Sequence, residues 1–195
     1  MKKRSSKSNK KMVETVLVLI FGLALLIYVL KTGAEIAIPY TNDELLEKYA
    51  SENHLEKGLV AAVIYQESGY QADAISDRGA IGLMQIMPDT GEWIAEKLEE
   101  TYSEDRLLDP ETNVRYGTWY LKFLYDKYDN IQTALAAYNA GPTNVDGWLE
   151  DPDLFDGENL VHIPFAETKN YVETILRMKD VYEKMYADKF TESEQ

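Results

Sequence analysis

An uncharged apolar run near the N-terminus separates this chain into two parts that cannot belong to one fold. Residues 16–30 carry no charged side chain, and six basic side chains precede them at positions 2, 3, 4, 7, 10 and 11. Fifteen residues suit the apolar region of a signal peptide. Counted back to Met12, across Glu14 and Thr15, the run matches the roughly 20 residues that a transmembrane helix needs. The sequence therefore predicts either a membrane anchor or a signal peptide.

The flanks of this run favour an anchor with the rest of the chain outside the cell. Thr32 and Ala34 form a poor cleavage site, so we expect an uncleaved signal anchor over residues 12–31. Secretion after signal cleavage is the alternative. The basic flank places residues 1–11 in the cytoplasm as a tail. The predicted location is thus the cell membrane, with a single pass and an extracellular domain.

The rest of the chain is strongly acidic and has no cysteine. Residues 32–195 carry 13 basic and 33 acidic side chains, a formal net charge of about −20, which makes nucleic acid a poor partner. The lack of cysteine excludes disulfides, thiolate metal sites and a lipidated cysteine. His54 and His162 are isolated, so we expect no metal or cofactor. A disulfide-free domain outside the membrane fits a bacterial envelope.

Hydrophobic periodicity predicts an all-α, mainly helical domain. Asn42 and Asp109 offer N-caps, Pro88 and Pro110 suit the first helical position, and Gly69 is a helix stop. The predicted helices cover about residues 42–53, 55–68, 88–98, 110–128, 131–139 and 167–187, with a loop at 150–162 and a possible minimal β element within 76–87. Spacing also places Trp119, Tyr120, Phe123, Leu124 and Tyr125 in the core, although aromatic rings can instead stack on sugars.

Glu67 is the strongest catalytic candidate. It follows an apolar run, and in a helix Val60, Val63 and Ile64 would share its face, so the carboxyl should point toward the core. Burial disfavours the charged form and raises the pKa of a carboxyl, which then can donate a proton near neutral pH. Glu67 is therefore interpreted as a general acid. The alternative is a surface residue in the last turn before Gly69.

Four motifs accompany Glu67 in the sequence. They are Glu67-Ser68, the segment 76–88 with its Gly79-Ala80-Ile81-Gly82 core, residues 137–141 (AYNAG) and residues 163–172 (IPFAETKNYV). Together, and in this order, they resemble the soluble lytic transglycosylase family, whose domain has a goose-type-lysozyme-like fold and cuts the sugar backbone of peptidoglycan. The resemblance covers residues 41–189, which leaves residues 32–40 as a linker and 190–195 as a tail. The sequence identifies no protein partner.

The resemblance implies a set of substrate-binding residues. Positions that line the family's groove correspond to Ser76, Gln85, Met87, Tyr138, Asn139, Glu167 and Tyr171. It also implies that the Tyr138 hydroxyl lies near enough to orient the Glu67 carboxyl. For Tyr138 and Asn139, the alternative is that they satisfy local backbone groups. Met84 is expected to pack in the core.

Gly79 and Gly82 are expected to let the backbone pass close to a sugar chain, since the phosphate-binding glycine patterns are absent. Thr143 departs from the family, which often has glycine there. This departure concerns the shape of that loop and not the chemistry.

A single strong acid candidate also directs the expected mechanism. Glycosidases usually pair two carboxylates, whereas the resemblance implies that Glu67 alone protonates the MurNAc–GlcNAc bond and then accepts the C6 hydroxyl proton, giving 1,6-anhydro-MurNAc. The expected partners are peptidoglycan glycan strands. One alternative is a hydrolytic muramidase in which Asp73 or Asp77 positions water. The other is a wall-binding module that holds glycan without cutting it.

Overall fold

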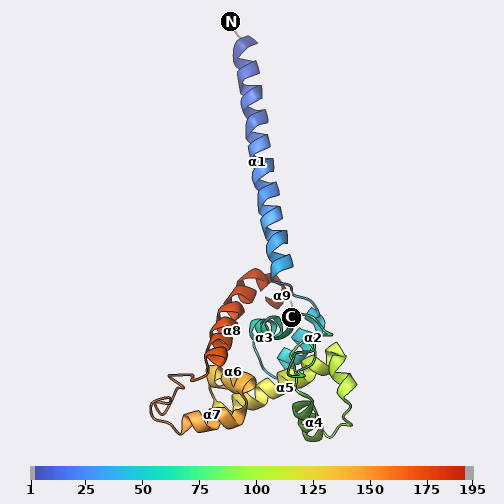
Figure 1. Ribbon diagram of the computed structural model, residues 1–195. Helices are drawn as coiled ribbons and strands as arrows, with labels where there is room; N and C mark the ends of the chain where they lie inside the picture. The colour runs from blue at the N-terminus through green and yellow to red at the C-terminus, as the bar shows by residue number, and fades with distance from the viewer. Residues whose placement is uncertain (1–2, 192–195) are drawn as a thin grey trace. The chain divides into compact units, whose positions relative to one another are not determined.

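The computed structural model describes residues 3–191, which are mainly helical and include no β-strand, and this confirms the all-α prediction. The chain divides into two compact units, Met1–Pro39 and Tyr40–Gln195 (Figure 1). The predicted N-terminal tail begins with two residues outside the described range, and residues 192–195 of the predicted C-terminal tail also lie outside it.

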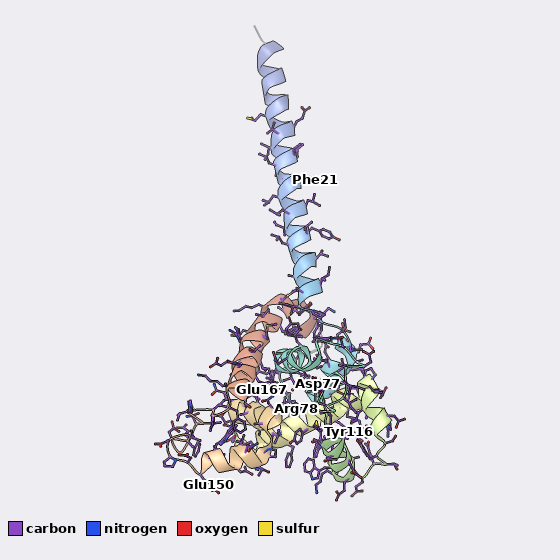
Figure 2. All side chains as sticks on the ribbon, viewed as in Figure 1. Phe21, Asp77, Arg78, Tyr116, Glu150 and Glu167 are labelled. Atoms are coloured by element: carbon purple, nitrogen blue, oxygen red, sulfur yellow. The ribbon has the colours of Figure 1, made fainter. Side chains whose placement is uncertain are left out.

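The first unit contains one long helix, α1 (Lys3–Ala37). Its segment Met12–Ala34, 23 residues with a mean hydropathy of 2.6, is long and apolar enough to cross a membrane. The apolar side chains of this segment are exposed, as Figure 2 shows for Phe21. An unburied apolar helix of this length suits a lipid environment, and a signal sequence near an N-terminus has the same properties.

The helices of the second unit follow the predicted ones closely. They are α2 (Asp43–Glu52), α3 (Lys57–Ser68), α4 (Pro88–Lys97), α5 (Pro110–Tyr128), α6 (Ile131–Ala140), α7 (Pro142–Leu149), α8 (Ala166–Met185) and α9 (Ala187–Thr191), with a 3₁₀ helix, η1 (Glu104–Leu108). Asp109 caps α5 by accepting a hydrogen bond from the Thr112 amide. Asn42 is left-handed and makes no side-chain cap, so its predicted capping role is wrong.

Helix α3 is the centre of this unit. Its residues from Gly58 to Ile64 are buried on every side, and it packs most extensively against α8, with α2 as another neighbour (Figure 1). A helix that is apolar all round must be surrounded by other helices. The burial of α3 fixes the position of its C-terminal turn, which carries Glu67.

Three local features differ from the predictions. Gly141-Pro142 ends α6 but also begins α7, because proline is well suited to the first helical position. The expected β element is limited to isolated bridges of Ile81 with Ile75 and with Ile86. The final predicted helix is split into α8 and α9 at Tyr186.

Most of the aromatic residues assigned to the core are not buried. Leu124 is fully buried, whereas Phe123 is 38% exposed and Trp119, Tyr120 and Tyr125 are half-buried. On α4, Trp93 is half-buried, while the neighbouring Ile94 is fully buried. Helical spacing places residues on a shared face but does not determine how completely a neighbouring helix covers that face.

Candidate active site

Glu67 lies in the last turn of α3, where the helix reaches a cavity of about 530 Å³. Gly69 then ends α3 in the left-handed conformation. Glu67 therefore lies two residues before the Gly69 stop and also faces a cavity. The residues that line the cavity are Glu67, Ser76, Asp77, Arg78, Ala80, Gln85, Met87, Tyr138, Asn139 and Glu167.

The surroundings of Glu67 favour its protonated form. Burial raises the pKa of the Glu67 carboxyl to about 7, and the hydrogen bond from Tyr171 opposes this rise. The Tyr171 hydroxyl donates to Glu67 Oε1 at 2.5 Å, and Tyr171 is only 5% exposed. With a pKa near neutrality, Glu67 is present in both protonation states at physiological pH. A group in that condition can both give and take a proton.

The segment opposite Glu67, residues 81–85, is held by side chains from three helices. The Ser68 hydroxyl of α3 donates to the Leu83 carbonyl at 2.8 Å, and the Tyr138 hydroxyl of α6 donates to the Met84 carbonyl at 2.8 Å. Asn113 of α5 accepts from the Met84 amide at 2.7 Å and donates to the Ile81 carbonyl at 2.8 Å. Hydrogen bonds to an otherwise irregular, buried backbone fix its shape.

Glycine is needed at position 82 for a reason other than the expected approach to a sugar chain. Its φ is +80°, and a Cβ there would lie 2.3 Å from the Asn113 amide nitrogen and 2.6 Å from the Leu107 carbonyl oxygen. Glycine is therefore required so that the loop can approach Asn113 inside the protein. The expectation that Gly82 admits a sugar chain is wrong, whereas Gly79 has a φ of +85° and open space around it.

Ser76, Gln85 and Met87 all line the cavity. The Ser76 Oγ accepts from the Ala80 amide, and the Gln85 amide group donates to the Gly82 carbonyl at 2.9 Å, so both residues also shape the loop. Met87 is 42% exposed, which leaves its thioether open to the cavity, whereas Met84 is buried as expected. Flexible, polarizable methionine is well suited to a surface that adapts to a ligand.

The expected contact between Tyr138 and Glu67 is replaced by another. Tyr138 lines the cavity, but its hydroxyl donates its single proton to the Met84 carbonyl, and the hydroxyl that donates to Glu67 is that of Tyr171. Asn139 also lines the cavity and accepts a hydrogen bond from the Thr168 hydroxyl at 2.7 Å, which joins the end of α6 to the start of α8.

Glu167 and Tyr171 share one face of α8 but differ in exposure. The Glu167 side chain is 70% exposed and lies 3.7 Å from Arg78, and both residues belong to the cavity lining, where Figure 2 labels them. Tyr171 is buried, does not line the cavity, and reaches the site through its hydrogen bond to Glu67. Glu167 lies in the first turn of α8, whereas Tyr171 lies one turn further along this helix, which packs against α3.

The positions of the other carboxylates bear on the two enzyme alternatives. Asp77 lines the cavity, whereas Asp73 does not.

The described residues 12–34 and 36–190, whose side chains are placed, include no group of three histidine, cysteine or acidic side chains able to hold a metal ion.

The Glu67 carboxyl and the glycine-shaped loop in front of it lie within a segment that matches a known family. Residues 44–161 match the Transglycosylase SLT domain. The chain belongs to that family. Its SLT domain thus contains Glu67, the loop and Tyr138, while Glu167 and Tyr171 follow the matched segment.

Relatives of the SLT domain include enzymes with different modes of membrane association. The soluble lytic murein transglycosylase of Escherichia coli K12 is 36% identical over 158 residues, which cover 78% of this chain and 24% of that protein. The membrane-bound lytic murein transglycosylase F of Histophilus somni 2336 is 32% identical over 163 residues, covering 68% of this chain and 32% of that protein. The chain thus spans about a quarter to a third of these relatives.

Solved structures show the same fold. The 70-kDa soluble lytic transglycosylase of Escherichia coli superposes with a TM-score of 0.71 at 36% identity, covering 80% of this chain and 26% of that one. An inactive mutant of lytic transglycosylase Slt from Pseudomonas aeruginosa gives a TM-score of 0.71 at 32% identity, covering 78% of this chain and 25% of that one. The lysozyme-like SLT fold expected from the motifs is confirmed.

Sequence analysis missed several residues that shape the site. Asn113 is 1% exposed and bonds to three backbone groups, yet it lies outside every motif. Arg78, which lines the cavity and lies 3.7 Å from Glu167, was not recognised either. The one signal in the sequence was that Asn113 is a polar residue on the same helical face as Val114, Gly117 and Leu121.

Proposed function

We propose that this protein is a membrane-anchored lytic transglycosylase that cleaves the MurNAc-β-1,4-GlcNAc bond of peptidoglycan. The observation that carries this proposal is Glu67, whose carboxyl has a pKa of about 7 and faces a cavity large enough for sugar rings. Family membership supports the same substrate class. The activity named for the relatives, lytic murein transglycosylase, is carried over to this chain as part of the proposal.

In the proposed reaction, Glu67 performs both proton transfers. Its protonated carboxyl gives a proton to the glycosidic oxygen while the bond from that oxygen to MurNAc C1 breaks. The resulting carboxylate takes the proton of the MurNAc C6 hydroxyl, whose oxygen attacks C1 and closes the 1,6-anhydro ring. Glu67 ends protonated, so the cycle consumes no water. The substrate's acetamido group stabilises C1 between the two steps, which removes the need for a second carboxylate.

The other cavity residues are proposed to bind the substrate. Ser76, Gln85 and Asn139 present neutral hydrogen-bonding groups, which suit hydroxyl and N-acetyl groups. Met87 offers an apolar, adaptable surface, and Glu167 borders the opposite side. Tyr171 is proposed as a positioning residue, because its hydrogen bond holds one oxygen of the Glu67 carboxyl.

A hydrolytic muramidase is the second candidate, and one observation favours it. Asp77 and Glu167 line the same cavity as Glu67, so either could position a water molecule for attack on C1. Glu167 lies 3.7 Å from Arg78, whereas no such ion pair engages Asp77 among the described residues. Asp77 is therefore the first residue to test as the base in a hydrolytic mechanism.

The reaction product distinguishes the two candidates. Digestion of purified peptidoglycan in ¹⁸O-labelled water should give muropeptides that end in 1,6-anhydro-MurNAc, because the attacking oxygen comes from the sugar itself. Mass spectrometry should show ends one water lighter than hydrolytic ends, resistant to borohydride and free of ¹⁸O. Reducible, labelled ends would make the protein a muramidase, and Asp77→Asn should then abolish the labelled product.

Anchoring by α1 is proposed from its composition and from the basic residues before it. The segment Met12–Ala34 is apolar enough to span a membrane, and six positive charges precede it, which favours a cytoplasmic N-terminus. The protein should therefore sediment with membranes, and protease added to wall-stripped cells should degrade the SLT domain. A soluble form in the medium that starts near Glu35 would show instead that α1 is a cleaved signal.

A further inference from the structure

Four aromatic side chains form a surface cluster beside the candidate active site. We call Trp93 of α4 with Trp119, Tyr120 and Phe123 of α5 the aromatic platform. The Trp93 ring centroid lies 5.7, 6.0 and 5.0 Å from those of Trp119, Tyr120 and Phe123. The Trp119 and Phe123 rings are stacked at 5.8 Å. None of the four is buried, although aromatic side chains of this size contribute most to stability when fully covered.

The platform borders a concave site of its own. A cavity of about 410 Å³ is lined by Asp89, Thr90, Trp93, Tyr120, Phe123, Lys127 and Pro142. Its walls are largely aromatic, with a carboxylate, a hydroxyl and an ammonium among the polar groups. Pockets of this size with apolar walls and a few polar groups are typical binding sites for small rigid ligands.

This second cavity continues the candidate active site. The Tyr120 ring lies 5.6 Å from the ring of Tyr138, and Tyr138 lines the cavity that contains Glu67. Two stretches of the chain line first one cavity and then the other. Met87 lines the Glu67 cavity, and Asp89 and Thr90 line the second cavity. Likewise Asn139 lines the Glu67 cavity, and Pro142, three residues later, lines the second cavity. A polymer that leaves the Glu67 cavity on this side would therefore meet the platform.

We propose that the aromatic platform binds pyranose rings of the glycan strand beyond the sugars that react at Glu67. This inference rests on the proposed function for its choice of ligand. A pyranose ring has an apolar face of C–H groups that can pack on an aromatic face, and equatorial hydroxyls that bond to polar groups at the edge. The cavity offers both, with Trp93 and Phe123 as faces and Asp89 and Thr90 at the edge.

A glycan fits this surface better than a membrane or an acidic protein. Asp89 lines the cavity, Lys127 is paired with Asp146 at 2.7 Å, and the body of the chain carries an excess of acidic side chains. Such charge repels anionic lipids and acidic partners but does not disfavour a neutral sugar. With the platform occupied, the enzyme holds several sugars on one side of the cleaved bond, so longer strands should bind more tightly.

Binding measurements test the platform separately from catalysis. The full-length protein in detergent, carrying Glu67→Gln to prevent turnover, is titrated by calorimetry with the hexamer of β-1,4-linked GlcNAc and with peptide-free glycan strands from peptidoglycan. Trp93→Ala and Phe123→Ala should each weaken hexamer binding by roughly tenfold, the loss usual for a central aromatic contact. Trp93→Tyr keeps an aromatic face and should recover most of the affinity. Leu108→Ala is the control, since Leu108 is 40% exposed and lines neither cavity.

Three outcomes overturn the proposal. Hexamer binding within twofold of the parent protein in both alanine variants, with lowered melting temperatures, would make the platform a structural cluster. Self-association that depends on Trp93, without sugar binding, would make it a contact between copies of this chain. A parent protein that binds neither probe would exclude a glycan site altogether. Phe123→Ala keeps the test valid if Trp93→Ala does not fold, because Phe123 is the most exposed of the four rings.

The proposed function can fail independently. If Glu67→Gln does not reduce peptidoglycan cleavage in the otherwise unaltered protein, the catalytic assignment is wrong. Trp93-dependent binding of the hexamer would then still establish the platform as a carbohydrate site. If the alanine variants bind the hexamer as the parent protein does, while cleavage still depends on Glu67, the proposed function stands and the platform proposal fails.

Discussion

Replacement of Glu67 by glutamine should lower the rate of peptidoglycan cleavage by roughly 10²–10⁴-fold or more, the contribution typical of general acid–base catalysis. Glutamine has nearly the same shape but can neither give nor accept the proton that the reaction moves. The loss should therefore appear in kcat, with glycan binding retained. Release of muropeptides from purified peptidoglycan, followed by chromatography, measures the effect.

Folding should not suffer from this substitution, and at alkaline pH it should improve. The Glu67 pKa of about 7 lies above the ordinary value of 4.5, so the folded state binds the proton more tightly than the unfolded state. Stability is then lost as pH rises from 4.5 to 7, by no more than about 3 kcal/mol. Glu67→Gln removes this loss, so its advantage over wild type in urea unfolding should be larger at pH 8 than at pH 5.

A matched control distinguishes the effect of removing the Glu67 carboxyl from the effect of removing a carboxyl elsewhere on the protein. Glu173 is exposed on α8 and lies outside the cavity, so Glu173→Gln should leave cleavage unchanged. More than a tenth of wild-type turnover in Glu67→Gln would contradict the assignment, and Asp77 and Glu167 would become the next candidates. A difference in stability between Glu67→Gln and wild type that is the same at pH 5 and pH 8 would contradict the raised pKa.

Replacement of Asn113 by alanine should destabilise the SLT domain by about 3–5 kcal/mol, since several buried polar groups lose their partner at once. Asn113 accepts from the Met84 amide and donates to the carbonyls of Ile81 and Leu107, each within 2.8 Å. Because Asn113 is 1% exposed, water does not readily replace these bonds. Urea unfolding followed by tryptophan fluorescence measures the change.

The same variant should also impair cleavage, because Asn113 holds the backbone next to Gln85 and opposite Glu67. Asn159→Ala is the matched control, as Asn159 is an exposed asparagine whose loss should change stability by less than about 0.5 kcal/mol. Equal stability of the Asn113 variant and the control would show that the 81–85 segment is held by the Ser68 and Tyr138 contacts alone.

Local sequence signals were sufficient for most helix positions. Pro110 and Asp109 define the start of α5, and Gly69 defines the end of α3, because each conformation depends on a residue's own backbone preference. Such signals failed at Asn42, whose side chain does not cap α2, and at Pro142, which begins a helix where none was predicted. In both cases the local conformation depends on neighbouring segments as well as on the residue's own backbone preference.

The pairing of side chains across the site could not be read from the sequence. Tyr138, which is half-buried, and Tyr171, which is buried, both lie near Glu67, and no local pattern tells which hydroxyl reaches the carboxyl. Helix packing decides this, because α8 places Tyr171 behind α3 while α6 points Tyr138 at the Met84 carbonyl. The exposure of Phe123 likewise depends on how far α4 covers α5.

The sequence by itself determined the helical fold and the apolar N-terminal segment and was enough to propose Glu67 as the acid, because periodicity, charge and chemically specific motifs are properties of neighbouring residues. Only the tertiary structure decided which tyrosine holds Glu67, why Gly82 must be glycine and how Asn113 supports the loop. Each of these depends on a distance between segments far apart in the chain, and such distances are set by packing in three dimensions.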